Sequence, residues 1–124
     1  MHIALGYLLV FIGGGLGAMA RHGVNRAGLA LLGPGFPWWT MAINIAGSFA
    51  IGLLAGLFGA FETGQQTRLF LVTGFLGGFT TFSAFSLDTL ALWQRGEHSA
   101  AAIYTLGSVI LSLIAVVAGL AVSR

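Results

Sequence analysis

The sequence predicts an all-α integral membrane protein with four transmembrane helices. The chain has 124 residues, of which 57% are hydrophobic and only 6% are charged, whereas soluble domains carry roughly 25% charged residues. About 20 apolar residues span the hydrocarbon core of a bilayer, and the few charges and two prolines divide the chain into four such stretches. We expect them at about 3–32, 38–61, 69–94 and 99–122, within one domain that covers residues 1–124.

Local signals mark the ends of these stretches. The segment Gly33-Pro34-Gly35-Phe36-Pro37 ends the first one, because proline lacks a backbone donor and restricts the residue before it. The Trp38-Trp39 pair opens the second, since aromatic residues anchor helices at the membrane interface. We expect polar turns at 62–68 and at Arg95-Gly96-Glu97-His98, which separate the second, third and fourth stretches.

The third stretch is a poor sequence for an unbroken lipid-facing helix. Within the uncharged run 69–87 it places the pair Gly77-Gly78 ahead of Thr80, Thr81 and Ser83. Backbone that leaves the helix inside a bilayer is tolerated only where it is buried in protein or lines a watery cavity. We therefore predict a broken third helix, with the break at about 77–80, at a functional centre.

Charge and composition exclude several classes of function. The net charge of +2 comes from five arginines against three acids, and these arginines form no basic cluster that would bind nucleic acid. The chain has no cysteine, so it has no disulfide framework and no zinc–thiolate site. No set of nucleophile, base and orienting group suggests an enzyme.

Arginine placement carries little information about orientation in the membrane. Four crossings put both termini on one side, together with Arg68 and Arg124, and leave Arg21, Arg26 and Arg95 on the other side. Positive charge in short loops sets orientation, and this split of two against three gives almost no bias. The sequence thus suggests an antiparallel dimer of identical chains, which resembles the inverted repeats of larger transporters.

Polar residues repeat at helical spacing on the second and fourth stretches. The two trios, each at i, i+4 and i+8, are Thr40, Asn44 and Ser48, and Tyr104, Ser108 and Ser112. One interpretation is hydrogen bonding between helices, at about 0.6 kcal/mol on average. The other is an ion path, and because these stripes hold amide and hydroxyl groups without a carboxylate, they suit an anion better than a cation.

Single charged and aromatic residues leave alternatives open. Arg21 is either a functional residue near membrane depth or a side chain that snorkels to the interface. Asp88 either sits at a pore mouth or faces interfacial water. Phe82 and Phe85 are packing or lipid contacts, or they turn their positive ring edges towards an anion.

The motifs resemble those of the Fluc (CrcB) family of fluoride channels. They are Gly13-Gly14-Gly15-Leu16-Gly17-Ala18 with Arg21, Thr40 and Asn44 with Gly47-Ser48-Phe49, and GFLGGFTTFSAF at 74–85. The resemblance covers essentially the whole chain. It implies a dual-topology antiparallel homodimer in the bacterial inner membrane, with two fluoride pores per dimer and a structural sodium ion on the two-fold axis. Passive exit of fluoride from the cytoplasm would lower fluoride toxicity.

The resemblance also implies roles for individual residues. The backbone carbonyls of Gly77 and Thr80 from both chains would hold the sodium ion. The fluoride pathway would contain Phe82, Phe85, Asn44, Ser48, Thr40, Tyr104, Ser108, Ser112, Thr81, Ser83 and Arg21. The family usually has a hydroxyl residue where this chain has Ala84, which puts one local hydrogen bond in doubt.

Two other functions fit the composition. A small dual-topology multidrug exporter would need a carboxylate deep in the first crossing for proton coupling, and the chain has none there. A non-transporting structural membrane protein would leave both the glycine break and the polar stripes unexplained. The sequence therefore favours the fluoride channel.

Overall fold

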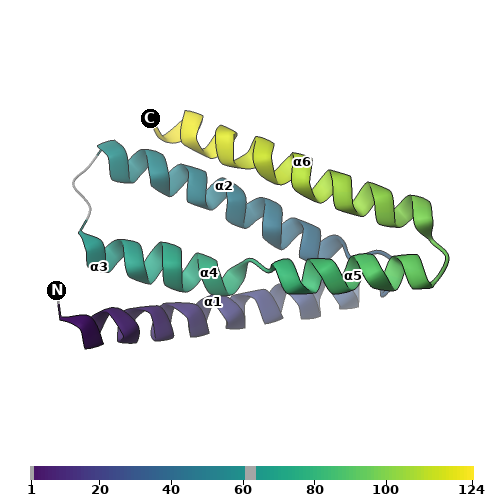
Figure 1. The fold of residues 1–124 in the computed structure, drawn as a ribbon, viewed down its shortest axis with the longest axis horizontal. Coiled ribbons are helices and arrows are strands. Elements are labelled where there is room, and N and C mark those ends of the chain that lie inside the picture. The colour runs from purple at the N-terminus through teal and green to yellow at the C-terminus, as the bar shows by residue number, and fades with distance from the viewer. Residues whose placement is uncertain (1, 61–63) are drawn as a thin grey trace.

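The computed structural model describes residues 2–60 and 64–124, and within these ranges every regular element is a helix (Figure 1). Four helices within them are long and apolar enough to cross a membrane: Ile3–Leu32, Trp38–Gly59, Gln65–Gln94 and His98–Ser123. The prediction of an all-helical chain with four membrane-crossing helices is thereby confirmed. Both chain ends lie at the same end of the bundle (Figure 1).

Three of the crossings are single helices, and the third is built from several pieces. The single helices are α1 (Ile3–Leu32), α2 (Trp38–Ala60) and α6 (His98–Ser123). The third crossing consists of α3 (Gln65–Arg68), the π-helix η1 (Leu69–Leu76), α4 (Gly77–Phe79) and α5 (Phe82–Gln94). The helix α1 packs along η1 and α4, and α2 packs along α6.

The start of the third crossing differs from the sequence expectation. We expected a polar turn at 62–68, but Gln65–Arg68 already forms the first helical turn, α3. Glutamine and arginine are good helix formers, so the helix extends beyond the apolar run. The expected end of the second crossing at residue 61 and the first part of that turn lie outside the described residues.

The π-helix η1 was not foreseen. Its register is seen at its end, where the N–H of Gly77 donates to the carbonyl of Val72, five residues earlier in the chain. Apolar periodicity could not reveal it, because every residue of Leu69–Leu76 except Thr73 and Gly74 is apolar. Such segments inside α-helices frequently occur at functional sites.

Glycines bring the helices into backbone contact along two seams. Gly13 and Gly17 of α1 face the backbone of the third crossing, where an added Cβ would clash with the carbonyl oxygens of Phe70 and Phe75 respectively. On the α2–α6 seam, Gly52 meets the carbonyl of Val116 in the same way. Close approach through small residues drives helix association where lipid offers no hydrophobic gain.

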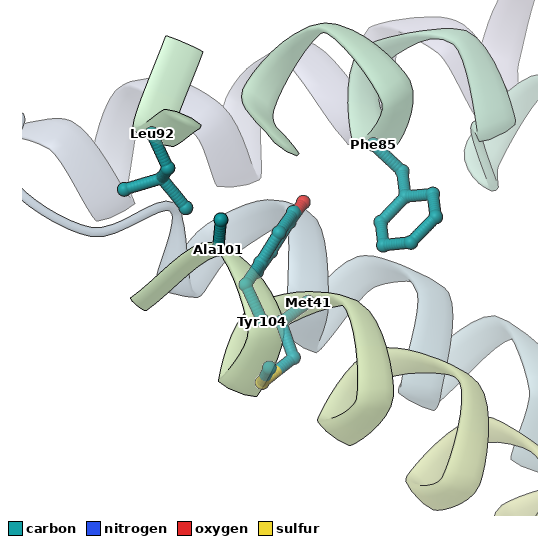
Figure 2. Packing of buried hydrophobic residues seen from close by; sticks show 5 residues of the cluster. All are labelled: Met41, Phe85, Leu92, Ala101 and Tyr104. Atoms are coloured by element: carbon teal, nitrogen blue, oxygen red, sulfur yellow. The ribbon is translucent and has the colours of Figure 1, made fainter. Parts of the chain in front are cut away.

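A small apolar core fills the end of the bundle where α5, α6 and α2 meet. Figure 2 shows its members, Met41, Phe85, Leu92, Ala101 and Tyr104. Tyr104 is fully buried. This cluster fixes α5 against α6 and thereby sets where the chain resumes a helix after the third crossing is interrupted.

Candidate functional site

The third crossing is interrupted at two threonines. Thr80 has φ −80° and ψ 156°, and Thr81 has φ −150° and ψ 122°, so both are extended. The pair Gly77-Gly78, which we placed inside the break, remains helical in α4. The interruption therefore lies later than expected, because Gly78 packs against the backbone of Gly14 while the extended residues find hydrogen-bond partners elsewhere.

Asn44 on α2 supplies both of those partners for Thr81. The backbone N–H of Thr81 donates to Asn44 Oδ1 at 2.9 Å, and Asn44 Nδ2 donates to the Thr81 carbonyl at 3.0 Å. The side-chain amide thus pairs with the backbone as a second peptide group would. Backbone polar groups inside a membrane must be satisfied by protein, so Asn44 makes the extended conformation tolerable at this depth.

Thr81 also begins the next helix. Its Oγ1 accepts from the N–H of Ala84 at 3.1 Å, which makes Thr81 the N-cap of α5. The hydroxyl of Ser83 lies 3.3 Å from the same atom. The cap therefore does not depend on a hydroxyl at position 84, where this chain has alanine.

We predict that Thr81→Val lowers the free energy of unfolding by about 1 kcal/mol, the usual effect of losing an N-cap. Valine keeps the shape and leaves the two backbone bonds with Asn44 in place, so the change isolates the cap. Thermal unfolding in detergent measures it. Ser83→Ala is the matched control, because in the described part of the chain the exposed Ser83 hydroxyl is hydrogen-bonded only to that of Thr81, and equal effects of both variants would contradict the assignment.

A cavity of about 440 Å³ lies beside the break, between α2, α6 and the third crossing. Nine residues that the sequence analysis placed in a site line it: Asn44, Ser48, Gly77, Thr80, Thr81, Phe82, Phe85, Ser108 and Ser112. The cavity wall also contains Gly47, Ile51, Val72, Leu76 and Val109. The structure therefore collects side chains from three crossings around one space.

The polar groups of this cavity are amide and hydroxyl groups. No carboxylate or basic side chain lines it among the described residues. Ser108 is only 5% exposed, and its Oγ has no hydrogen-bond partner in the described part of the chain. A buried hydroxyl is normally paired, so Ser108 is available to a small polar occupant of the cavity.

Two phenylalanines form the end of the cavity at α5. The rings of Phe82 and Phe85 lie 5.6 Å apart at an angle of 58°. Phe85 is buried in the core cluster, whereas Phe82 leaves 78% of its surface exposed. The cavity is therefore not enclosed by one chain on the side of Phe82.

Four of the residues assigned to the fluoride pathway do not line this cavity: Thr40, Tyr104, Ser83 and Arg21. Thr40 and Tyr104 are buried, and the hydroxyl of Tyr104 donates to Asp88 Oδ2 at 3.0 Å. Asp88 thus has a protein partner on α6. Ser83 is exposed beside Thr81.

Arg21 lies on the other side of the third crossing. Its Nε donates to the carbonyl of Gly78 at 3.1 Å. Neither interpretation from the sequence, a residue on the ion path or a snorkelling side chain, anticipated a backbone carbonyl as its partner.

A second cavity of about 280 Å³ adjoins the first, and the two share Ile51 and Val72. Gln65, Arg68 and Thr73 give it a polar end. Sequence reasoning missed Ile51, although its position seven residues after Asn44 places it on the same helical face. Arg68 was considered only for orientation; its guanidinium carbon lies 5.1 Å from the ring centre of Phe58.

A donor-lined cavity beside interrupted backbone at membrane depth defines a class of membrane proteins that bind or pass ions and small polar solutes. Comparison with known proteins makes this specific. Residues 8–120 match the family model described as "CrcB-like protein, Camphor Resistance (CrcB)". The chain belongs to the CrcB family, as the motifs indicated.

Curated relatives cover nearly the whole chain. It is 56% identical over 120 residues to the "Fluoride-specific ion channel FluC" of Rhodopseudomonas palustris (strain BisB5), covering 95% of this chain and 96% of the relative. It is 58% identical over 118 residues to the protein of that name from Paracoccus denitrificans (strain Pd 1222), covering 95% and 94%. For Rhizobium leguminosarum bv. trifolii (strain WSM2304) the identity is 54% over 118 residues, covering 94% of each. This is a family of ion channels, and the chain is a multi-pass membrane protein and not an enzyme.

Proposed function

We propose that this protein is a fluoride-selective ion channel, through which fluoride leaves the cytoplasm passively. The observation that carries the proposal is the cavity beside the break, where Asn44, Ser48 and Ser108 bring donors together without a carboxylate. The relatives named fluoride-specific ion channels agree with it. We place the channel in the bacterial inner membrane, where passive exit lowers fluoride toxicity.

The donors of the cavity can replace the water around a small anion. Filters in channels work in this way, by exchanging an ion's hydration shell for protein groups. One N–H of the Asn44 amide is engaged with Thr81, which leaves the second for an anion. The unpaired hydroxyl of Ser108 adds another donor, and the ring edges of Phe82 and Phe85 carry positive partial charge.

We propose further that two antiparallel chains close the site and form two pores. Phe82 lines the cavity with 78% of its surface exposed, so a second copy is a suitable cover. Gly77, which lines the same cavity, is also exposed. The nearly balanced arginines favour insertion in both orientations, which an antiparallel dimer requires.

A structural sodium ion fits the backbone at Gly77 and Thr80. The N–H of Thr81 donates to Asn44, so the Gly77 carbonyl lacks the partner that a continuous helix would give it. The N–H of Ala84 donates to the Thr81 side chain, so the Thr80 carbonyl lacks its helical partner too. Among the described residues, a Cβ on Gly77 would meet only the carbonyl oxygen of Val72, at 3.7 Å, so there is room around this glycine.

These carbonyls supply the uncharged oxygens that unwound membrane helices offer to sodium. When bound, the ion contributes a positive charge beside the anion path and joins the two chains. In the described residues, no group of three or more His, Cys, Asp or Glu side chains could hold a metal. Gly77 and Thr80 from each of two chains are therefore the residues that we assign to it.

Purified protein in liposomes tests the proposed channel. We expect loaded vesicles to release fluoride quickly, and chloride far more slowly, as followed with ion-selective electrodes. Phe82→Ile removes an aromatic edge and keeps an apolar side chain, so it should slow fluoride release by about tenfold, the effect of losing one contact of about 1.4 kcal/mol. Empty vesicles give the background. Absence of fluoride release from the wild type, or equal release of chloride, would refute the proposal.

A further inference from the structure

The position of Arg21 follows from the glycine seam of α1. Gly13, Gly17 and Arg21 are spaced i, i+4 and i+8, so they share one helical face. The two glycines press this face against the backbone of the third crossing. Arg21 continues the same line and reaches the third crossing beside the break, where α1 and α4 lie together (Figure 1).

The partner of Arg21 is a carbonyl that the break leaves without its helical donor. In a continuous α-helix the carbonyl of Gly78 would accept from the N–H four residues later, that of Phe82. Thr81 is extended, and Phe82 begins a new helix. The Nε of Arg21 donates to this carbonyl at 3.1 Å, in a partly buried position.

The carbonyls proposed to hold sodium belong to Gly77 and Thr80, which line the large cavity. Arg21 lines neither of the two cavities described above, so it approaches the segment from the other side. Asn44 holds Thr81 from the side of α2. The interrupted segment is therefore held from both sides, by Arg21 at Gly78 and by Asn44 at Thr81.

We infer that Arg21 is a positioning residue: it keeps the Gly78 carbonyl on the α1 side of the break, so that the Gly77 and Thr80 carbonyls remain available to a cation in the cavity. This inference rests on the proposed sodium site. It assigns the importance of Arg21 to its Nε donor and not to its positive charge. The net charge of the guanidinium repels a nearby cation, so a purely electrostatic role would oppose sodium binding.

Three substitutions separate the donor from the charge. In glutamine, Nε2 is bonded to Cδ, as Nε is in arginine, so Arg21→Gln keeps a donor at the same distance along the side chain and removes the charge. The methionine of Arg21→Met has a side chain about as long as that of glutamine, with neither a donor nor a charge. Arg21→Lys keeps the charge and moves the donor one atom further out.

Sodium-dependent thermal stability of the purified full-length protein provides the test. Each variant is unfolded in detergent over a range of sodium concentrations, with a bulky organic cation keeping the ionic strength constant. We expect the sodium concentration for half of the stabilisation to rise by about tenfold in Arg21→Met, the consequence of losing a hydrogen bond from a charged donor. Arg21→Gln should stay at or below the wild-type value.

The sodium midpoints of the Arg21 variants decide between the two roles. A wild-type midpoint in Arg21→Met, or midpoints raised equally in Arg21→Met and Arg21→Gln, would overturn the inference. If Arg21→Met does not fold, Arg21→Lys decides, because it keeps the charge and moves only the donor: a midpoint above the wild-type value supports a donor role, and a wild-type midpoint overturns it. A wild type without any sodium-dependent stabilisation would also overturn it, while fluoride release from liposomes would still support the channel.

Discussion

Replacing Asn44 with leucine is expected to lower the free energy of unfolding by about 2–6 kcal/mol, because it leaves two backbone groups of Thr81 without partners at about 1–3 kcal/mol each. Leucine has a similar size and cannot pair with either group. We expect fluoride release from liposomes to fall to the background of empty vesicles. Thermal unfolding in detergent and ion-selective electrodes measure the two effects.

Ser48→Ala is the control for this change. Ser48 lies one turn further along α2 and lines the same cavity, yet no hydrogen bond joins it to the third crossing in the described part of the structure. Its loss should leave the unfolding temperature nearly unchanged. Asn44→Asp keeps the acceptor for the Thr81 N–H and places a second acceptor against the Thr81 carbonyl, so it should be destabilising as well. Wild-type unfolding and flux in Asn44→Leu would contradict the role of the amide pair.

Gly17→Ala is the second change with a large expected effect. A Cβ at Gly17 would collide with the carbonyl oxygen of Phe75 and lie 2.9 Å from the backbone nitrogen of Phe79. Backbone cannot move aside as a flexible side chain would, so α1 must separate from the third crossing. Overpacking of this kind typically lowers stability by about 1–3 kcal/mol, and here it would also pull Arg21 away from Gly78.

Gly15 provides a matched comparison on the same helix. It is exposed, and a Cβ there would meet no atom of the described residues within 4 Å. Gly15→Ala should therefore raise stability by about 0.5–1 kcal/mol, the usual gain from replacing glycine inside a helix. We expect the two alanine variants to move the unfolding temperature in opposite directions. If Gly17→Ala were as stable as Gly15→Ala, the close seam between α1 and the third crossing would be wrong.

The four crossings could be predicted from the sequence because the signals that define them are local. The length of each apolar run sets each crossing. The proline segment at 33–37 separates the first crossing from the second, and the turn at 95–98 separates the third from the fourth. The π-helix η1 could not be predicted, since its apolar residues fit more than one helical period. The helical turn Gln65–Arg68 was missed because polarity, which suggests a loop, does not prevent a helix.

The position of the break could not be predicted from the neighbouring residues alone. The glycine pair predicted a break at about 77–80, but Gly77-Gly78 is helical and the extended residues are Thr80 and Thr81. Their conformation depends on Asn44, which is 37 residues away along the chain, and the Gly78 carbonyl depends on Arg21, which is 57 residues away. Helical spacing identified two polar trios, and the structure brings Asn44, Ser48, Ser108 and Ser112 of them to one cavity, whereas Thr40 and Tyr104 do not line it.

Both residues that hold the interrupted segment are synthesised before it. Arg21 and Asn44 both precede Gly78 and Thr81 in the chain, and membrane segments emerge from the ribosome from the N-terminus onward. When the third crossing enters the bilayer, the groups that satisfy its unpaired backbone are already there. A chain with the reverse order of helices would have to hold bare peptide groups in lipid until its partners arrived.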